Sequence, residues 1–377
     1  FNEMNLITGG MAAVNNVYTD IHDLNKCKIT MEIKTKVLYP NLDKAIALMQ
    51  EIIMTSDFTD TKRLQEIIAE GRSRTQSQMM SAGHSVAVGR VASYGSVSGE
   101  IGELISGVPF YRLLCELDDH FDAKKEDLIE KLQEIAKFIC RKENLMVDYV
   151  GTEEGMEKLE NCMESFAEGL YSCSIKKESF VPVISVKNEG FMTSGQVQYV
   201  CRGGNFKKKG LDYTGSLRAL KVMMGYEYLW NNVRVKGGAY GCMCGFGKSG
   251  ECYFVSYRDP NLGKTVEIFE KAAENIRMFE ADERTMTQYI IGAVSDLDIP
   301  MNPAALGLFS LSAYMTGVTQ EMLQKERDEL LVTTEEDIRG LAEYIDAFVS
   351  ENHLCVVGNT EKIKEESELF MHTENLF

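Results

Sequence analysis

A strict alternation of apolar and polar side chains runs over residues 28–37. Ile29, Met31 and Ile33 fall on one face, while lysine, threonine and glutamate fall on the other, which predicts a strand with one buried face. Residues 251–257 are the expected counterpart of this strand, and Gly247-Lys-Ser-Gly250 before them predicts a hairpin turn that leads into it.

A helical period follows each of these two strands. The first apolar stripe comprises Leu42, Ala45, Ile46, Met49 and Ile53, and the second comprises Val266, Phe269, Ala272 and Ile276. The pattern predicts further helices at about 60–82, 108–117, 124–141, 153–169, 214–230, 281–294, 302–316, 320–331, 333–350 and 360–370. It predicts further strands at 144–150, near 196–202 and at 353–358.

The chain contains an internal repeat with a period above 200 residues. Three segments recur in the same order: Thr8-Gly-Gly10 as Lys236-Gly-Gly238, Pro40-Asn-Leu as Pro260-Asn-Leu, and Glu143-Asn144 as Glu351-Asn352. So long a period indicates a duplicated domain rather than a solenoid.

Strands at both ends of each copy, with helices between them, predict an α+β fold. We expect two homologous sandwich domains, each an antiparallel sheet with helices packed on one face. The first spans 1–170, a polar linker spans 171–190, and the second spans 191–377. The first copy reaches its double glycine by residue 9, so we expect its opening strand and helix to be absent and the chain to be part of a longer protein.

Composition narrows the functional classes. The 377 residues carry a net charge of −17, which disfavours nucleic acid and anionic membranes as partners and favours cationic peptides. No apolar run approaches the roughly 20 residues that span a bilayer. The ten cysteines are mostly scattered, which predicts reduced thiols in a bacterial cytosol, with an organelle matrix as the alternative. In the single cluster, Cys242, Cys244 and Cys252, we expect strand packing rather than metal binding.

The segment from Val233 to Gly241 carries the candidate chemistry. Arg234 and Tyr240 flank Gly237 and Gly238 between an amphipathic helix and a strand. Such a turn can present a fixed cation and a phenol while its glycines let another backbone approach, which suits binding of a peptide carbonyl. The structural alternative is a glycine turn with a surface arginine and a half-buried tyrosine.

The first copy bears on that choice. It keeps the double glycine, but Leu6 and Ala12 stand where the second copy has Arg234 and Tyr240. The polar pair is therefore particular to the second copy, which favours a functional role for it.

This segment, the Tyr257-Arg-Asp-Pro-Asn261 turn and the duplication together resemble the C-terminal half of the pitrilysin/insulinase zinc peptidases, in the presequence-protease branch. The resemblance covers essentially the whole chain. It implies four homologous α+β domains that form two bowl-like halves around a peptide chamber, with this chain supplying the third and fourth. It also implies that Arg234 and Tyr240 are catalytic and substrate-binding residues. Tyr240 would donate to the developing oxyanion and Arg234 would hold a neighbouring backbone carbonyl, with Gly237 and Gly238 beside the substrate.

In that family the zinc site is an inverted His-x-x-Glu-His motif in the first domain. None of the five histidines here, His22, His84, His120, His353 and His372, begins such a motif. We therefore expect no metal site and no cofactor in this chain. Zinc would be bound by the N-terminal half of the same protein, which is the expected partner together with a peptide substrate. The chain alone is expected to have no peptidase activity.

Two other classes stay open: a non-catalytic pitrilysin-like scaffold or partner subunit, and a peptide-binding domain that captures a strand at its sheet edge. The Arg234 and Tyr240 pair favours the peptidase, because a scaffold has no need of an oxyanion donor. A His-x-x-Glu-His motif upstream would separate the classes.

Overall fold

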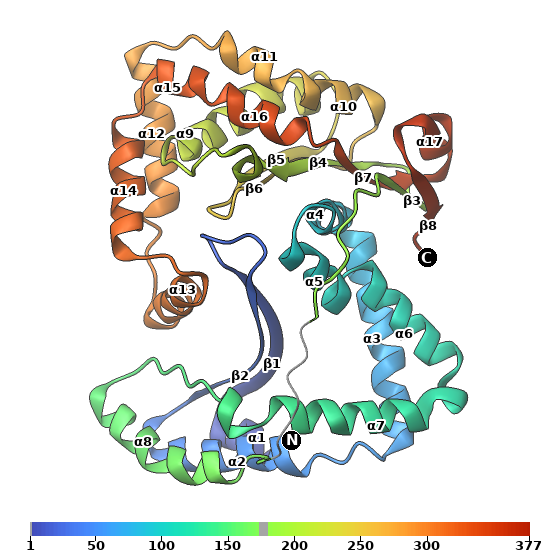
Figure 1. The fold of residues 1–377 in the computed structure, drawn as a ribbon, viewed down its shortest axis with the longest axis vertical. Helices are drawn as coiled ribbons and strands as arrows, with labels where there is room; N and C mark the ends of the chain where they lie inside the picture. The colour runs from blue at the N-terminus through green and yellow to red at the C-terminus, as the bar shows by residue number, and fades with distance from the viewer. Residues whose placement is uncertain (1, 173–179) are drawn as a thin grey trace.

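The computed structural model describes residues 2–172 and 180–377. Its first part contains two strands and eight α-helices, and Figure 1 shows the long β1–β2 ribbon rising from the layer of α1, α2 and α8. The elements are α1 (Asn2–Ile7), β1 (Thr8–Thr19), β2 (Cys27–Val37), η1 (Tyr39–Asn41), α2 (Leu42–Thr55), α3 (Thr61–Ser81), α4 (Gly83–Ser93), α5 (Val97–Ser106), α6 (Val108–Asp119), α7 (Phe121–Ile139), η2 (Lys142–Asn144) and α8 (Glu153–Glu168).

The second part holds a six-stranded sheet with the order β5-β6-β4-β7-β3-β8. Its strands are β3 (Glu189–Thr193), β4 (Tyr199–Asn205), β5 (Gly241–Phe246), β6 (Glu251–Tyr257), β7 (His353–Asn359) and β8 (His372–Asn375). Its helices are η3 (Phe206–Lys209), α9 (Ser216–Met223), η4 (Met224–Tyr228), η5 (Trp230–Val235), α10 (Gly263–Glu270), α11 (Ala272–Arg277), α12 (Glu283–Leu297), α13 (Pro303–Thr316), α14 (Gln320–Leu331), α15 (Glu335–Gly340), α16 (Ala342–Val349), α17 (Thr360–Glu365) and η6 (Ser367–Leu369).

The α+β class is confirmed, but the large sheet differs from the expected arrangement in two ways. It is mixed, because β3 runs parallel to both of its neighbours, β7 and β8. Both of its faces are also covered. Val200 and Phe254 pack with α9 and α16 on one face, whereas Cys201 and Val255 pack against α4 of the first part on the other. Figure 1 shows α4 beneath the sheet and α16 above it.

The two copies share one order of elements. In each, a helical segment leads into a double glycine, a β-hairpin and a Pro-Asn-Leu segment followed by a helix, and Gly10 and Gly238 both adopt positive φ, 109° and 85°. A short helix, α1, precedes the first double glycine, and the expectation that the opening strand and helix of the first copy are missing stays a prediction. The boundaries at residues 170 and 190 stay a prediction. Residues 173–179 of the predicted linker lie outside the described residues, and β3 already begins at Glu189.

The strand expected at 144–150 does not form. Leu145, Met146, Val147 and Val150 are between 36% and 49% exposed and follow η2 in an extended run. Its counterpart β7 is paired on both sides, by β3 and β4, whereas the described part of the first copy has no strands in those positions. Without a neighbouring strand, the backbone N–H and C=O groups of an apolar segment have no partners with which to form a β-sheet.

Several helical expectations also change in detail. The helix expected at 333–350 is divided into α15 and α16 after Gly340, and the one at 214–230 continues from α9 into the two π-helical segments η4 and η5. The helix expected at 360–370 ends at Glu365. The predicted helices at 60–82, 108–117, 124–141, 153–169, 281–294, 302–316 and 320–331 are confirmed within a few residues. No helix of the described chain is long and apolar enough to span a bilayer.

Candidate functional site

The two glycines terminate the helix that carries Arg234. The Gly238 N–H donates to the Arg234 carbonyl at 2.8 Å, and the Ala239 N–H donates to the Val233 carbonyl at 3.2 Å. With Gly238 at φ 85°, the bond from Gly238 to Arg234 is that of an αL cap, and the side chains of Val233 and Ala239 on either side of the turn are buried. A Cβ atom at Gly237 would lie 2.4 Å from the Val233 carbonyl oxygen. The primary role of both glycines is therefore to turn the chain sharply after Arg234.

Arg234 lies between two aromatic rings. Its guanidinium carbon is 3.9 Å from the centroid of the Trp230 ring and 5.8 Å from that of the Tyr240 ring. Trp230 precedes Arg234 by one helical turn, so the stacking fixes the direction of the side chain. Within residues 2–172 and 180–377, no carboxylate pairs with Arg234. Its N–H groups are thus held in place with their hydrogen-bonding capacity unused.

Tyr240 is held by its main chain and by one ring contact. Its backbone N–H donates to the carbonyls of Tyr257 at 3.1 Å and Arg258 at 3.3 Å. Its ring meets that of Tyr257 edge to face at 5.9 Å between centroids. The residue is 67% exposed, and its hydroxyl has no hydrogen-bond partner in the described part of the chain. The phenol is therefore positioned, with its hydroxyl free for a ligand.

A buried aspartate holds the turn after β6 against the glycine turn. The Asp259 carboxylate accepts hydrogen bonds from the Thr265 hydroxyl at 2.7 Å and the Asn261 N–H at 2.9 Å. The Asn261 side-chain amide in turn donates to the Gly237 carbonyl at 2.7 Å. Burial raises the pKa of Asp259 above its usual value. The network ties both turns together beneath Tyr240.

The first part of the chain also reaches the site. His84, at the N-terminal end of α4, meets Tyr257 edge to face at 4.9 Å and lies 6.2 Å from the Tyr199 ring. Burial lowers the pKa of His84. A row of rings thus runs from α4 through Tyr257 to Tyr240.

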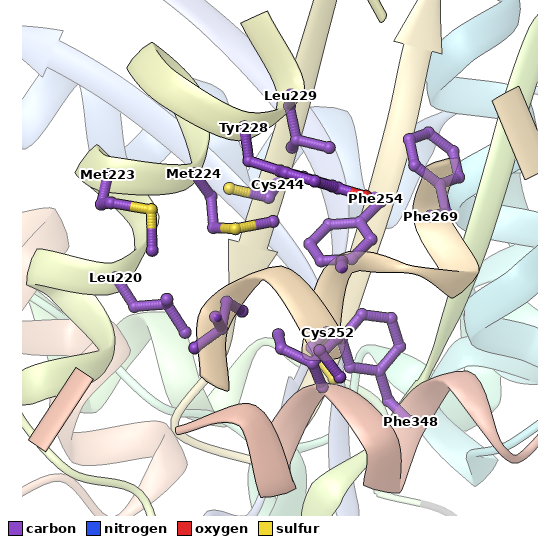
Figure 2. Packing of buried hydrophobic residues seen from close by; sticks show 14 of the residues in the cluster. Leu220, Met223, Met224, Tyr228, Leu229, Cys244, Cys252, Phe254, Phe269 and Phe348 are labelled. Atoms are coloured by element: carbon purple, nitrogen blue, oxygen red, sulfur yellow. The ribbon is translucent and has the colours of Figure 1, made fainter. Parts of the chain in front are cut away.

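The hydrophobic core beneath the site supports its helix. Figure 2 shows Met224 and Tyr228 of η4, and Leu229 between η4 and η5, on the same side of the core as Phe254 of β6. The Tyr228 hydroxyl donates to the Ile268 carbonyl at 2.7 Å, which satisfies its polar end within the core. The helix that presents Arg234 is therefore anchored to the sheet over its whole inner face.

The cysteine cluster belongs to this core. Cys244 and Cys252 are buried on the face of the sheet that packs with α9 and α16. Burial raises the pKa of the Cys244 thiol to about 12. Metal ligation requires the thiolate, which such burial disfavours. Among residues 2–172 and 180–377, no group of three or more His, Cys, Asp or Glu side chains is placed to hold a metal ion.

Sequence reasoning missed the residues that hold Arg234 and Tyr240. Trp230 had a usable signal, since it is the single tryptophan of the chain and stands four residues before Arg234 on a predicted helix. His84 had none, because its contact with Tyr257 joins positions far apart in the sequence.

Comparison with known proteins shows the family of the chain. Residues 188–362 match the family described as "PreP C-terminal domain", and residues 1–117 match the family of regions associated with M16 peptidases of subfamily C. The chain belongs to the M16 peptidase family, in its presequence-protease branch. Within that branch it corresponds to a C-terminal half.

Individual relatives support this placement. "Protein HypA" of Clostridium perfringens is 36% identical over 375 residues, which is all of this chain and 38% of that protein. Presequence protease 1, chloroplastic/mitochondrial, of Arabidopsis thaliana is 28% identical over 333 residues, covering 88% of this chain and 31% of that protein. This M16 chain therefore spans 38% and 31% of the length of these two relatives.

The fold agrees with a solved M16 structure. The crystal structure of pitrilysin superposes with a TM-score of 0.59 at 12% identity, over 93% of this chain and 35% of that one. At so low an identity the likeness concerns the fold alone.

Proposed function

We propose that this chain is the half of an M16 peptidase that presents Arg234 and Tyr240 to a peptide substrate. The observation that carries the proposal is the arrangement of the two side chains. Arg234 is clamped between two rings without a carboxylate partner in the described chain, and Tyr240 exposes a free hydroxyl beside it.

These groups suit the hydrolysis of a peptide bond. Negative charge grows on the carbonyl oxygen as the bond is attacked, and a donor that is already in position stabilises that charge without reorganisation. The Tyr240 hydroxyl is the proposed donor. Arg234, whose planar fork has several N–H groups, holds a neighbouring backbone carbonyl of the substrate and so fixes its register. Removing one such donor typically costs about 10²–10³ in rate.

The zinc that serves M16 peptidases does not fit the described residues, since none of their His, Cys, Asp and Glu side chains form a set of three or more that could hold it. We therefore assign zinc binding to an N-terminal half of the same protein. The two halves would enclose a chamber for unstructured peptides. The chain alone would then lack peptidase activity.

We also propose a bacterial cytosol as the compartment, with an organelle matrix as the alternative. The bacterial relative is more similar to this chain than the plant one, at 36% against 28% identity.

The test is the hydrolysis of an unstructured fluorogenic peptide by three preparations: the full-length protein, residues 1–377 alone, and residues 1–377 mixed with the separately produced N-terminal half. We expect activity in the first and the third, loss of that activity with a chelator, and its return with zinc. Zinc-dependent cleavage by residues 1–377 alone would overturn the proposal. A full-length protein that binds no zinc and cleaves nothing would instead be a scaffold.

A further inference from the structure

Arg258 occupies an unusual backbone conformation beside the site. Its φ is 49°, in the left-handed region that residues other than glycine enter rarely and at some cost. Asparagine or glycine would adopt this conformation more easily, so the turn alone gives no reason for an arginine.

The neighbouring contacts hold Arg258 in that conformation. Its carbonyl accepts from the Tyr240 N–H at 3.3 Å, and the next residue, Asp259, exchanges two backbone hydrogen bonds with Gln198 at 2.7 and 2.9 Å. The Asp259 side chain turns inward and is completely buried, while Arg258 turns outward and is exposed. The carboxylate nearest in sequence therefore does not neutralise the arginine.

The Arg258 side chain lies over the aromatic row. Its guanidinium carbon is 5.5 Å from the centroid of Tyr257, the ring that supports Tyr240. Hydrogen bonding to Tyr199 raises the pKa of Arg258. The cation is thus guided toward the side of Tyr240 by two tyrosines.

The site is locally cationic in a chain whose net charge is −17. Arg234 and Arg258 lie in the two turns that meet at Tyr240, Lys236 stands four residues before Tyr240 in the first turn, and none of the three forms an ion pair with any described residue. The Lys236 ammonium contacts only a neutral group, the Asn232 amide oxygen at 3.3 Å. Unneutralised cations grouped around a free hydroxyl favour an anionic ligand.

We propose that Arg258 is a substrate-binding residue that takes a carboxylate of the peptide, either its C-terminal group or an acidic side chain. The proposal rests on the proposed function. It assigns to Arg258 a preference for peptides with a carboxylate, which the Arg234 and Tyr240 pair does not explain. A guanidinium binds a carboxylate through charge-assisted, often bidentate, hydrogen bonds. The neutral backbone carbonyls assigned to Arg234 and Tyr240 need no second guanidinium.

The experiment measures kcat and KM of the full-length protein on matched unstructured peptides. One pair differs only in its end, a free C-terminal acid against an amide. A second series replaces a single internal glutamine by glutamate at successive positions. Arg258→Asn removes the charge with a residue that tolerates positive φ, Arg258→Lys keeps the charge without the fork, and Arg284→Gln removes an exposed arginine outside the cluster.

The wild type should bind the carboxylate-bearing peptide with a KM about tenfold lower than its neutral partner. Arg258→Asn should abolish this ratio, Arg258→Lys should keep part of it, and Arg284→Gln should keep all of it. If KM differs between the acid and the amide peptide, the carboxylate that Arg258 binds is the C-terminal group. If KM differs within the glutamate series, the carboxylate belongs to a side chain.

Equal KM values for both members of every pair in the wild type would overturn the proposal. An undiminished ratio in Arg258→Asn would overturn it as well. If the wild type hydrolyses no peptide, the proposed function fails. Fluorescence anisotropy with the same labelled peptides then tests the carboxylate preference and its dependence on Arg258 by binding alone.

Discussion

The guanidinium of Arg234 lies 3.9 Å from the centre of the Trp230 ring, with one helical turn between the two residues. The contact is local and arises because positions i and i+4 share one face of a helix. It uses the face of the guanidinium and leaves its N–H edge available. Trp230 therefore determines where Arg234 points without occupying the groups that would bind a substrate.

Replacing Trp230 by alanine should weaken the binding of peptide by the full-length protein. The cation–π contact is worth about 1 kcal/mol at a partly exposed site, so KM should rise about fivefold with a smaller effect on kcat. Trp230→Phe keeps an aromatic face and should lie between wild type and alanine. Steady-state kinetics on one peptide checks this. Identical KM values for Trp230→Ala and wild type would show that the stack does not position Arg234.

Substitution by alanine should destabilise the chain more at Gly237 than at Gly238. Gly237→Ala brings a Cβ within 2.4 Å of the Val233 carbonyl oxygen, so the backbone must move, at about 2–4 kcal/mol of unfolding free energy. Gly238→Ala meets nothing closer than the Pro260 ring at 3.5 Å and is expected to cost only the strain of positive φ, about 1 kcal/mol.

Chemical denaturation of residues 1–377 measures both costs. Gly225→Ala is the matched control, because its Cβ would meet nothing within 4 Å. It should be neutral or slightly stabilising. A larger loss for Gly238→Ala than for Gly237→Ala would show that the positive φ of Gly238, and not the close approach at Gly237, is the stricter requirement of the turn.

A buried acid should make the stability of the chain depend on pH. Glu103 lies in a network with Arg90, whose guanidinium is 3.1 Å from it, and Arg90 also pairs with Glu189 of β3. Burial raises the pKa of Glu103 above its usual 4.5. As pH rises, the unfolded chain therefore releases this proton first, and the free energy of unfolding falls until the pH passes the raised pKa of the folded state.

Glu103→Gln removes that titration. Relative to this variant, the wild type should be most stable below pH 4.5 and should lose stability as pH rises above it. Denaturant unfolding of both proteins between about pH 4 and pH 7 gives the comparison. If the unfolding free energies of the two proteins differ by a constant amount over the whole pH range, Glu103 releases its proton at the same pH in the folded and the unfolded state.

The sequence predicted the elements whose pattern is local. The alternation before Val37 and the Gly247–Gly250 turn identified the second strand of each hairpin, because period and turn chemistry are visible within a few residues. Likewise Arg234 and Tyr240 were found from their spacing around two glycines. Their roles remain predictions.

Long-range packing accounts for what the sequence did not reveal. α4 and α5 are rich in glycine and serine, which are poor helix formers, and burial against the sheet and against each other overrides that preference. The 144–150 segment shows the opposite case, since its apolar residues suit a strand but the described chain brings no partner strand beside it. The ring contact between His84 and Tyr257 likewise depends on tertiary structure alone.

The most direct test of the proposed role of Tyr240 is the rate of peptide hydrolysis by the full-length protein with Tyr240→Phe, measured beside its zinc content and its melting temperature. The substitution removes one exposed hydroxyl and keeps the ring that meets Tyr257. We predict a fall in kcat of about 10²-fold with zinc content and stability unchanged. Full activity in Tyr240→Phe would contradict this role and would leave Tyr240 as a packing residue of the turn.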